Sequence, residues 1–172
     1  MAAAPAHAVA VVVPGGFQLL DLAGPADVLR AASLLGATPR YDVRYLTPGG
    51  GPVRSDAGVA ITPDGGLGDA PARLGTLLVV GGLGTERAAH DPATVASVRR
   101  LADRADRVAS VCTGAMLLAA AGVLDGRRAT THWGSTERLA ARHPLVRVEP
   151  DRIYVRDGDV WTSAGVTAGI DL

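Results

Sequence analysis

Short apolar runs alternate with longer segments of helical periodicity along this chain. The runs over residues 7–13, 76–80 and 108–111 are continuous and rich in valine, which predicts β-strands that are buried on both faces. A fourth run, over 41–46, alternates apolar and polar residues and predicts a strand as well. Apolar positions that recur every three or four residues predict helices over 19–35, 92–105, 115–121 and 135–143. This alternation predicts a doubly wound α/β sandwich around a mostly parallel sheet.

Proline, glycine and acidic residues indicate where some of these elements begin and end. Pro25 suits the first turn of the helix over 19–35, because a helix does not use the N–H group that proline lacks there. Val28 and Leu35 fall on one apolar face of that helix with two further apolar residues, so we expect this face to pack on the core. Gly36 suits the end of the helix, and Asp91 suits the N-cap of the helix over 92–105.

The C-terminal part of the chain predicts shorter elements. Short strands are expected over 146–148 and 153–155, and Asp157-Gly158 predicts a β-hairpin with the run over 159–162. The segment 163–172 reads as the start of a last helix, too short to cover a sheet face. We therefore expect a single domain over 1–172 that lacks its last helix and belongs to a longer protein.

Composition narrows the class of protein. The chain has 172 residues, 48% apolar and 20% charged, with a formal net charge of zero, so we expect no direct nucleic-acid binding by this chain alone. Its one cysteine excludes a disulfide framework and fits a reducing cytoplasm. The sequence shows neither a secretory signal nor a membrane-spanning run. Zinc-ligand spacing and phosphate-binding glycine loops are also missing, so we expect no metal and no cofactor.

The segment 107–124 predicts a strand, a tight turn and a helix, with Cys112 in the turn. Unpaired N–H groups and the helix dipole favour negative charge at such a helix N-terminus. We therefore expect Cys112 to have a lowered pKa and to be partly thiolate near neutral pH, with the Thr113 and Gly114 backbone available to an oxyanion. The alternative is that Cys112 is a buried, unreactive small hydrophobe.

Other candidate site residues follow the neighbouring strands, at the sheet edge where ligands bind in this kind of fold. Asp21 lies among leucines, so partial desolvation would raise its pKa and suit it to proton exchange with a thiol, as part of a coupled pair. The alternative is that Asp21 caps the next helix. Gly81 and Gly82 would allow a ligand to approach the backbone closely, so that an N–H group could donate to an anionic oxygen. The alternative is that the two glycines form a plain turn. His132 could act as a base toward Cys112, or be a packed side chain beside an aromatic residue.

The chain resembles the ThiJ/PfpI group of the class I glutamine amidotransferase-like superfamily along nearly its whole length. The resemblance lies in GFQLLDLAGPADVL at 16–29, LLVVGGLG at 77–84, SVCTGAMLLAAAGVLDGRRATTHW at 110–133 and VWTSAGVTAGIDL at 160–172. It implies a flavodoxin-like sandwich, Cys112 on a strained nucleophile elbow, Asp21 facing the thiol, and a homodimer. A protease-like pairing of Cys112 with His132 is implied more weakly.

Two branches of this superfamily resemble the chain. The segments RATTHWGSTERLAARHP and VWTSAGVTAGIDL are most similar to the ligand-sensing N-terminal domain of AraC-type transcription regulators. No helix-turn-helix region follows Leu172 in this sequence, so the DNA-reading half of such a regulator would lie outside it. Isocyanide hydratases are the next most similar. In that branch the matching cysteine attacks the isocyanide carbon, which implies catalytic roles for Cys112, Asp21 and Thr113. In both branches the expected partner is a small molecule.

Overall fold

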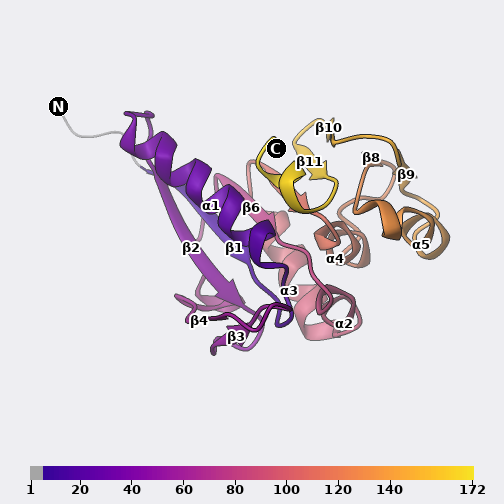
Figure 1. Ribbon diagram of the computed structural model, residues 1–172, viewed down its shortest axis with the longest axis horizontal. Helices are drawn as coiled ribbons and strands as arrows, with labels where there is room; N and C mark the ends of the chain where they lie inside the picture. Colours follow the sequence, from indigo (N-terminus) through magenta and orange to yellow (C-terminus); the bar gives the residue numbers. More distant parts are fainter. Residues whose placement is uncertain (1–5) are drawn as a thin grey trace.

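The core of the fold is a seven-stranded sheet in the order β10-β11-β7-β6-β1-β2-β5. Figure 1 shows β2, β1 and β6 of this sheet, with β10 and β11 near the C-terminus. In this computed structural model, which describes residues 6–172, the strands are β1 (His7–Val12), β2 (Tyr41–Thr47), β5 (Gly65–Gly66), β6 (Thr76–Val79), β7 (Val108–Val111), β10 (Tyr154–Asp157) and β11 (Val160–Ser163). Every neighbouring pair is parallel except β10 with β11. The first five residues of the predicted domain over 1–172 lie outside the described part.

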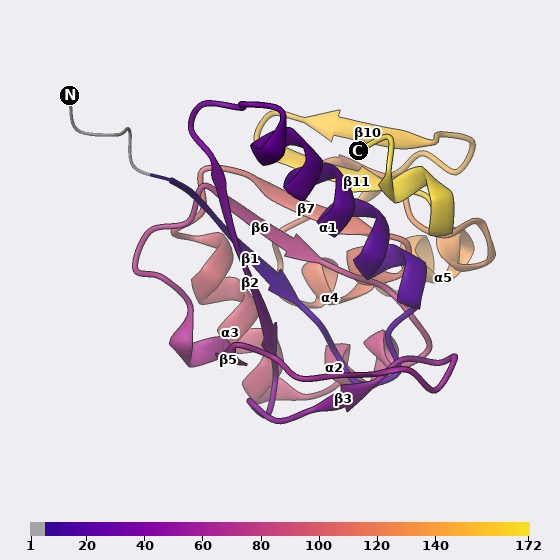
Figure 2. The ribbon, with the colours of Figure 1, turned by 60° about the vertical axis from the view of Figure 1, so that its left-hand side comes forward.

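Helices cover both faces of this sheet. Alternate residues of β1 point to opposite sides: Val9 and Val11 pack in the cluster that includes Leu22 of α1 (Leu19–Leu34), whereas Ala10 and Val12 pack with the other helices. Those are α2 (Thr85–Ala89), α3 (Pro92–Ala102) and α4 (Gly114–Ala120). Figure 2 shows α1 crossing in front of the sheet, with α3 and α4 on the far side. The predicted α/β sandwich around a mostly parallel sheet is confirmed.

Smaller elements complete the described chain. Two ribbons of two strands pair β3 (Val53–Arg54) with β4 (Ala60–Ile61) and β8 (Arg128–Ala129) with β9 (Arg147–Val148). The helix α5 (Thr136–Arg142) and three one-turn 3-10 helices account for the rest: Leu67–Asp69, Trp133–Ser135 and Val166–Gly169. The last of these lies in the segment where the sequence predicts the start of a helix. It packs beside α1, where a side chain on Gly24 would clash with Ile170.

Several boundary predictions are confirmed. The Asp91 carboxylate accepts a hydrogen bond from the Thr94 N–H at 3.0 Å and so caps α3. Gly36, with φ of 94°, follows the C-cap of α1, where a left-handed conformation favours glycine. The predicted hairpin forms between β10 and β11, with Gly158 at φ of 64° in its tight turn.

The predictions for α1 need two corrections. This helix begins at Leu19 after an N-cap at Gln18, so Pro25 lies inside it and not in its first turn. The missing proline N–H leaves the Asp21 carbonyl without its helical hydrogen bond. The face that includes Val28 and Leu35 is buried only in part: Leu29 packs against the core, whereas Val28 and Leu35 are 44% and 89% exposed. The helix reaches the core through Leu19, Leu22 and Leu29.

None of the helices formed by residues 6–172 is both long and apolar enough to cross a membrane.

A substitution in α4 tests the core packing. Leu117 is fully buried against the sheet, so Leu117→Ala removes apolar contacts and leaves a cavity. We expect the free energy of unfolding in urea to fall by about 2–5 kcal/mol. Leu34→Ala near the end of α1, where the side chain is 68% exposed, is the matched control and should change it by about 0.5 kcal/mol or less. Equal effects of the two substitutions would contradict this packing.

Candidate active site

Three loops meet at the carboxyl ends of the neighbouring strands β7, β6 and β1, as the sequence predicts. Cys112 follows β7, Gly81 follows β6, and Asp21 follows β1 in the first turn of α1. The loops approach so closely that a Cβ atom on Gly81 would lie 2.6 Å from the Thr113 nitrogen, 2.8 Å from Cys112 Cβ and 2.9 Å from Asp21 Oδ2. Only glycine fits at the end of β6, because any side chain there would displace the groups that it brings together.

Cys112 occupies the sharp turn between β7 and α4. Its φ of 57° is in the left-handed region, which is strained for a residue with a side chain. Hydrogen bonds hold this conformation from both sides: the Cys112 N–H donates to the carbonyl oxygens of Ser163 and Ala164 at 3.2 Å each. The Cys112 carbonyl accepts from the Thr131 hydroxyl at 2.8 Å. This geometry matches the nucleophile elbow that the resemblance implies.

Asp21 is fully buried against the elbow. Its Oδ1 accepts a hydrogen bond from the Val166 N–H at 3.2 Å. Within the described residues, Oδ2 has no hydrogen bond of standard geometry, and it faces Gly81 and the Cys112 thiol. The alternative that Asp21 caps α1 is wrong, because Gln18 is the N-cap. The carboxyl group is therefore held inside the site.

The titration of this pair differs from the prediction. Burial raises the pKa of Asp21 to about 6, which agrees with the expected direction. Burial and the nearby Asp21 charge also raise the pKa of Cys112 to about 12, although its contact with Thr113 opposes this. The expected lowered pKa of Cys112 is thus wrong: desolvation and a neighbouring carboxylate outweigh the N-terminus of a two-turn helix. Near neutral pH the pair holds one proton, on sulfur, and one negative charge, on Asp21.

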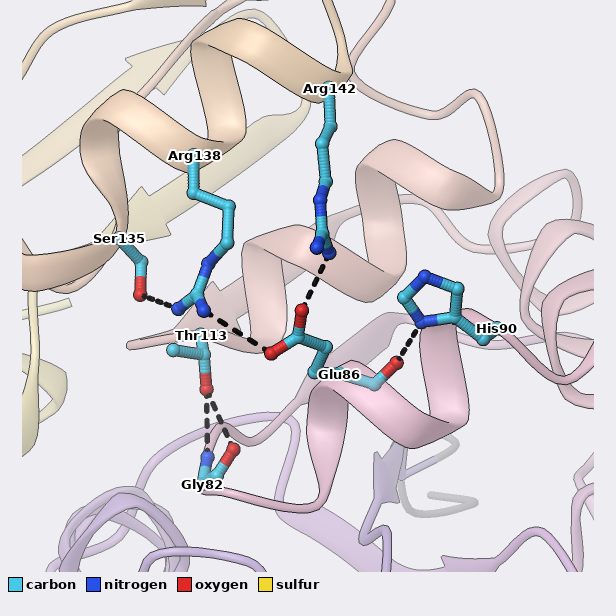
Figure 3. Close-up of polar contacts among 7 residues, drawn as sticks. All are labelled: Gly82, Glu86, His90, Thr113, Ser135, Arg138 and Arg142. Carbon is cyan, nitrogen blue, oxygen red and sulfur yellow. Dashed lines mark hydrogen bonds and ion pairs between the residues drawn. The ribbon is translucent and has the colours of Figure 1, made fainter.

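Thr113 connects the elbow to the end of β6. Its hydroxyl accepts from the Gly82 N–H at 2.9 Å and donates to the Gly82 carbonyl at 3.1 Å (Figure 3). The Gly82 N–H is therefore already paired, and the backbone of Gly81 contacts the Asp21 carboxylate. Thr113 is the residue whose donor groups contact the thiol. The ligand-binding roles of Gly81, Gly82, Thr113 and Gly114 stay predictions.

His132 lies at the site without pairing with the thiol. Its Nδ1 accepts a hydrogen bond from the Gly134 N–H at 3.1 Å, and its ring packs against Gly165. No hydrogen bond joins His132 to Cys112 among residues 6–172. The two residues face the same cavity, so a catalytic role for His132 stays a prediction.

A cavity of about 350 Å³ opens above the Cys112 thiol. Its walls come from the loops after β1, β3, β6 and β7, from α2, and from the segment around α5. The lining residues are Gln18, Asp56, Gly82, Leu83, Glu86, Cys112, Thr113, Met116, His132, Gly134, Ser135, Arg138 and Val166. In the described part of the chain, no group of three or more His, Cys, Asp or Glu residues could hold a metal ion.

Comparison with known proteins places this geometry in a family. The family model described as DJ-1/PfpI matches residues 7–172. The chain belongs to the DJ-1/PfpI family. It is 42% identical to an isonitrile hydratase of Pseudomonas putida over 90% of this chain and 64% of the relative. It is 37% identical to the HTH-type transcriptional regulator CdhR of Pseudomonas aeruginosa, over 91% of this chain and 46% of the relative.

Solved structures agree with this assignment. A ThiJ/PfpI family protein from Pseudomonas syringae superposes with a TM-score of 0.83 at 36% identity, over 97% of this chain and 66% of that one. The chain thus spans about half to two thirds of the length of these DJ-1/PfpI relatives.

Two parts of this DJ-1/PfpI site are not evident in the sequence. Val166 adopts φ of 57°, and only in that conformation does its N–H reach Asp21. Nothing in the sequence indicates this, because a β-branched residue normally avoids the left-handed region. Arg138 lies in a segment that predicts an ordinary helix, and the sequence predicts no element around Glu86, so only the folded chain brings the two to the same cavity.

Alkylation of the single cysteine tests the titration order. Iodoacetamide labelling of Cys112 should show a pH midpoint well above the free-cysteine value of about 8.5, because the thiolate is buried beside a carboxylate. Asp21→Asn removes the negative charge at nearly constant shape, so the midpoint should fall. A wild-type midpoint below about 8.5, or one that Asp21→Asn leaves unchanged, would contradict the contact.

Stability measured against pH tests the burial of Asp21 independently. The pKa is about 6 in the folded chain against 3.8 for the free group, so the folded state binds more protons between these values. The stabilising effect of the protonated carboxyl is present in full below about pH 4 and is lost as the pH rises through 6. Urea unfolding should show wild type losing about 2 kcal/mol relative to Asp21→Asn between pH 4 and pH 7. Parallel pH profiles of the two proteins would contradict the burial.

Proposed function

We propose that this domain is a cysteine-dependent hydratase that adds water to an isonitrile and releases an N-substituted formamide. The observation that supports it best is the buried Asp21 carboxyl group against the Cys112 thiol, in the turn beneath a cavity of about 350 Å³. A nucleophile in direct contact with a group that exchanges protons is the arrangement that covalent catalysis requires. The 42% identity to an isonitrile hydratase suggests which electrophile the thiol attacks.

The shared proton suits this electrophile. The terminal carbon of an isonitrile must gain a proton as well as a bond to sulfur, unlike a carbonyl carbon. In the first step Cys112 Sγ forms a bond to this carbon, and the thiol proton passes through Asp21 to the same carbon. The product is a thioimidate, R–N=CH–S–Cys112. A resting thiolate would lack the proton for this step, whereas the protonated thiol beside an ionised carboxylate supplies it.

Water completes the reaction. Asp21 accepts a proton from water as the oxygen bonds to the thioimidate carbon and passes that proton to the nitrogen, which gives R–NH–CH(OH)–S–Cys112 and returns Asp21 to the carboxylate. The C–S bond then breaks, the hydroxyl proton returns through Asp21 to sulfur, and R–NH–CHO leaves. One water is consumed, and both side chains return to their starting states. The contact of Thr113 with Cys112, which lowers the thiol pKa, stabilises negative charge on the departing sulfur.

The second candidate function is that of a ligand-sensing domain in an AraC-type regulator. The 37% identity to CdhR over 91% of this chain supports it, as do the segments that resemble the regulator branch. In that case the cavity above Cys112 binds an effector without turning it over. The two candidates differ in one measurable property: a hydratase releases formamide, whereas a sensor only binds.

Turnover by wild type and three variants decides between these functions. Wild type incubated with simple alkyl and aryl isonitriles should form N-substituted formamides, followed by loss of the isonitrile infrared band. Cys112→Ala should show no turnover, and Asp21→Asn should lower kcat by about 10²–10⁴-fold because proton transfer is lost. Arg30→Gln, on the exposed surface of α1, is the control for substitution itself. Saturable binding by wild type without any formamide would contradict the hydratase and favour the sensor.

A further inference from the structure

The cavity above Cys112 has one guanidinium group in its wall. Among the described residues that line it, Arg138 of α5 is the only arginine or lysine. Two hydrogen bonds hold its guanidinium group: Nη1 donates to Glu86 Oε2 at 3.2 Å, and Nη2 donates to Ser135 Oγ at 2.8 Å (Figure 3). A guanidinium group has five N–H donors, so three remain for a ligand.

The cluster around Arg138 keeps a positive charge. Arg138 and Arg142, one turn apart on α5, both reach the carboxylate of Glu86 on α2 (Figure 3), and Arg142 Nη1 lies 2.6 Å from Glu86 Oε1. One carboxylate therefore faces two guanidinium groups, which leaves a net charge of +1. Arg142 and Arg138 lower the pKa of Glu86, so the carboxylate stays ionised and this balance holds near neutral pH.

The two other carboxylates that the described residues place at this cavity, Asp21 beside Cys112 and Asp56 in the wall, form no ion pair with Arg138. Asp56 follows β3, and its backbone N–H donates to the Phe17 carbonyl at 2.9 Å, on the side of the cavity near the start of α1. In the described part of the chain it forms no ion pair with Arg138, whose only carboxylate partner is Glu86. A ligand group beside α5 therefore meets an excess of positive charge.

We propose that Arg138 determines the specificity of this cavity by selecting a substrate that bears a carboxylate in addition to the group that reacts with Cys112. A carboxylate accepts two parallel N–H bonds from a guanidinium group, and its single negative charge matches the excess of one positive charge in the cluster. A polyanion would need more basic side chains than this wall contains. The identity of the reacting group rests on the proposed function, whereas the choice of anion rests on Arg138 alone.

A matched pair of substrates tests this proposal. The probes are an ω-isocyanoalkanoate and its methyl ester, which differ in charge but keep the same reacting group. Wild type should prefer the carboxylate by about 10- to 100-fold in kcat/KM, mainly through KM, because charge-assisted hydrogen bonds are strong. Arg138→Gln should bring this ratio close to one. Arg138→Lys should retain part of the preference, since lysine keeps the charge but not the paired donors.

Controls separate this proposal from the proposed function. Arg30→Gln removes the same charge outside the cavity wall and should keep the wild-type ratio. A wild-type ratio near one, or a ratio that Arg138→Gln leaves unchanged, overturns anion selection. If neither probe is hydrated, the proposed hydratase function is wrong. Anion selection is then tested by calorimetry, with the Kd values of the two probes in place of kcat/KM. Tighter binding of the carboxylate that is lost in Arg138→Gln then supports anion selection, whereas equal Kd values overturn it.

Discussion

The contact between the Asp21 carboxyl group and the Cys112 thiol is the interaction on which this site depends. Both groups are acids, and both lie where little water reaches them. A thiolate in contact with a carboxylate would be repelled strongly in a poorly solvated site, so the pair keeps one proton over a wide range of pH. The chemistry of the cavity follows from the position of that proton. The proton lies on sulfur at rest, so Cys112 is a thiol with a proton acceptor, the Asp21 carboxylate, beside it.

The surrounding backbone is arranged to maintain this contact. Cys112 and Val166 are the two residues other than glycine with positive φ among residues 6–172, and both face Asp21. Such conformations cost on the order of 1–3 kcal/mol each, and they persist because the surrounding structure determines them. The Cys112 conformation is held by carbonyl groups that follow β11 and by the Thr131 hydroxyl. The C-terminal segment is therefore part of the site, although it lies far from Asp21 in the sequence.

The cavity has different charges at its two ends. The pair of Asp21 and Cys112 holds one negative charge at the base, whereas the cluster of Arg138, Arg142 and Glu86 has a net positive charge at the wall formed by α5 and α2. A bound molecule would meet its reacting partner and its orienting partner on separate elements.

The sequence alone determined the layered α/β fold and the turn at Cys112, because strand and helix periodicity and a strand–turn–helix motif are local signals. It left Asp21 as either a helix cap or a group that exchanges protons, and the structure decided between the two. The sequence also predicted that the loops after β1, β6 and β7 meet, since parallel strands bring their carboxyl ends to one edge. Only the tertiary structure decided the pKa of Cys112, because desolvation and the distance to Asp21 depend on residues remote in the chain. The tertiary structure also decided which residues of α1 are buried, what the Val166 N–H contacts, and where Arg138 lies. Each of these depends on contacts between distant segments, which no local pattern of residues specifies.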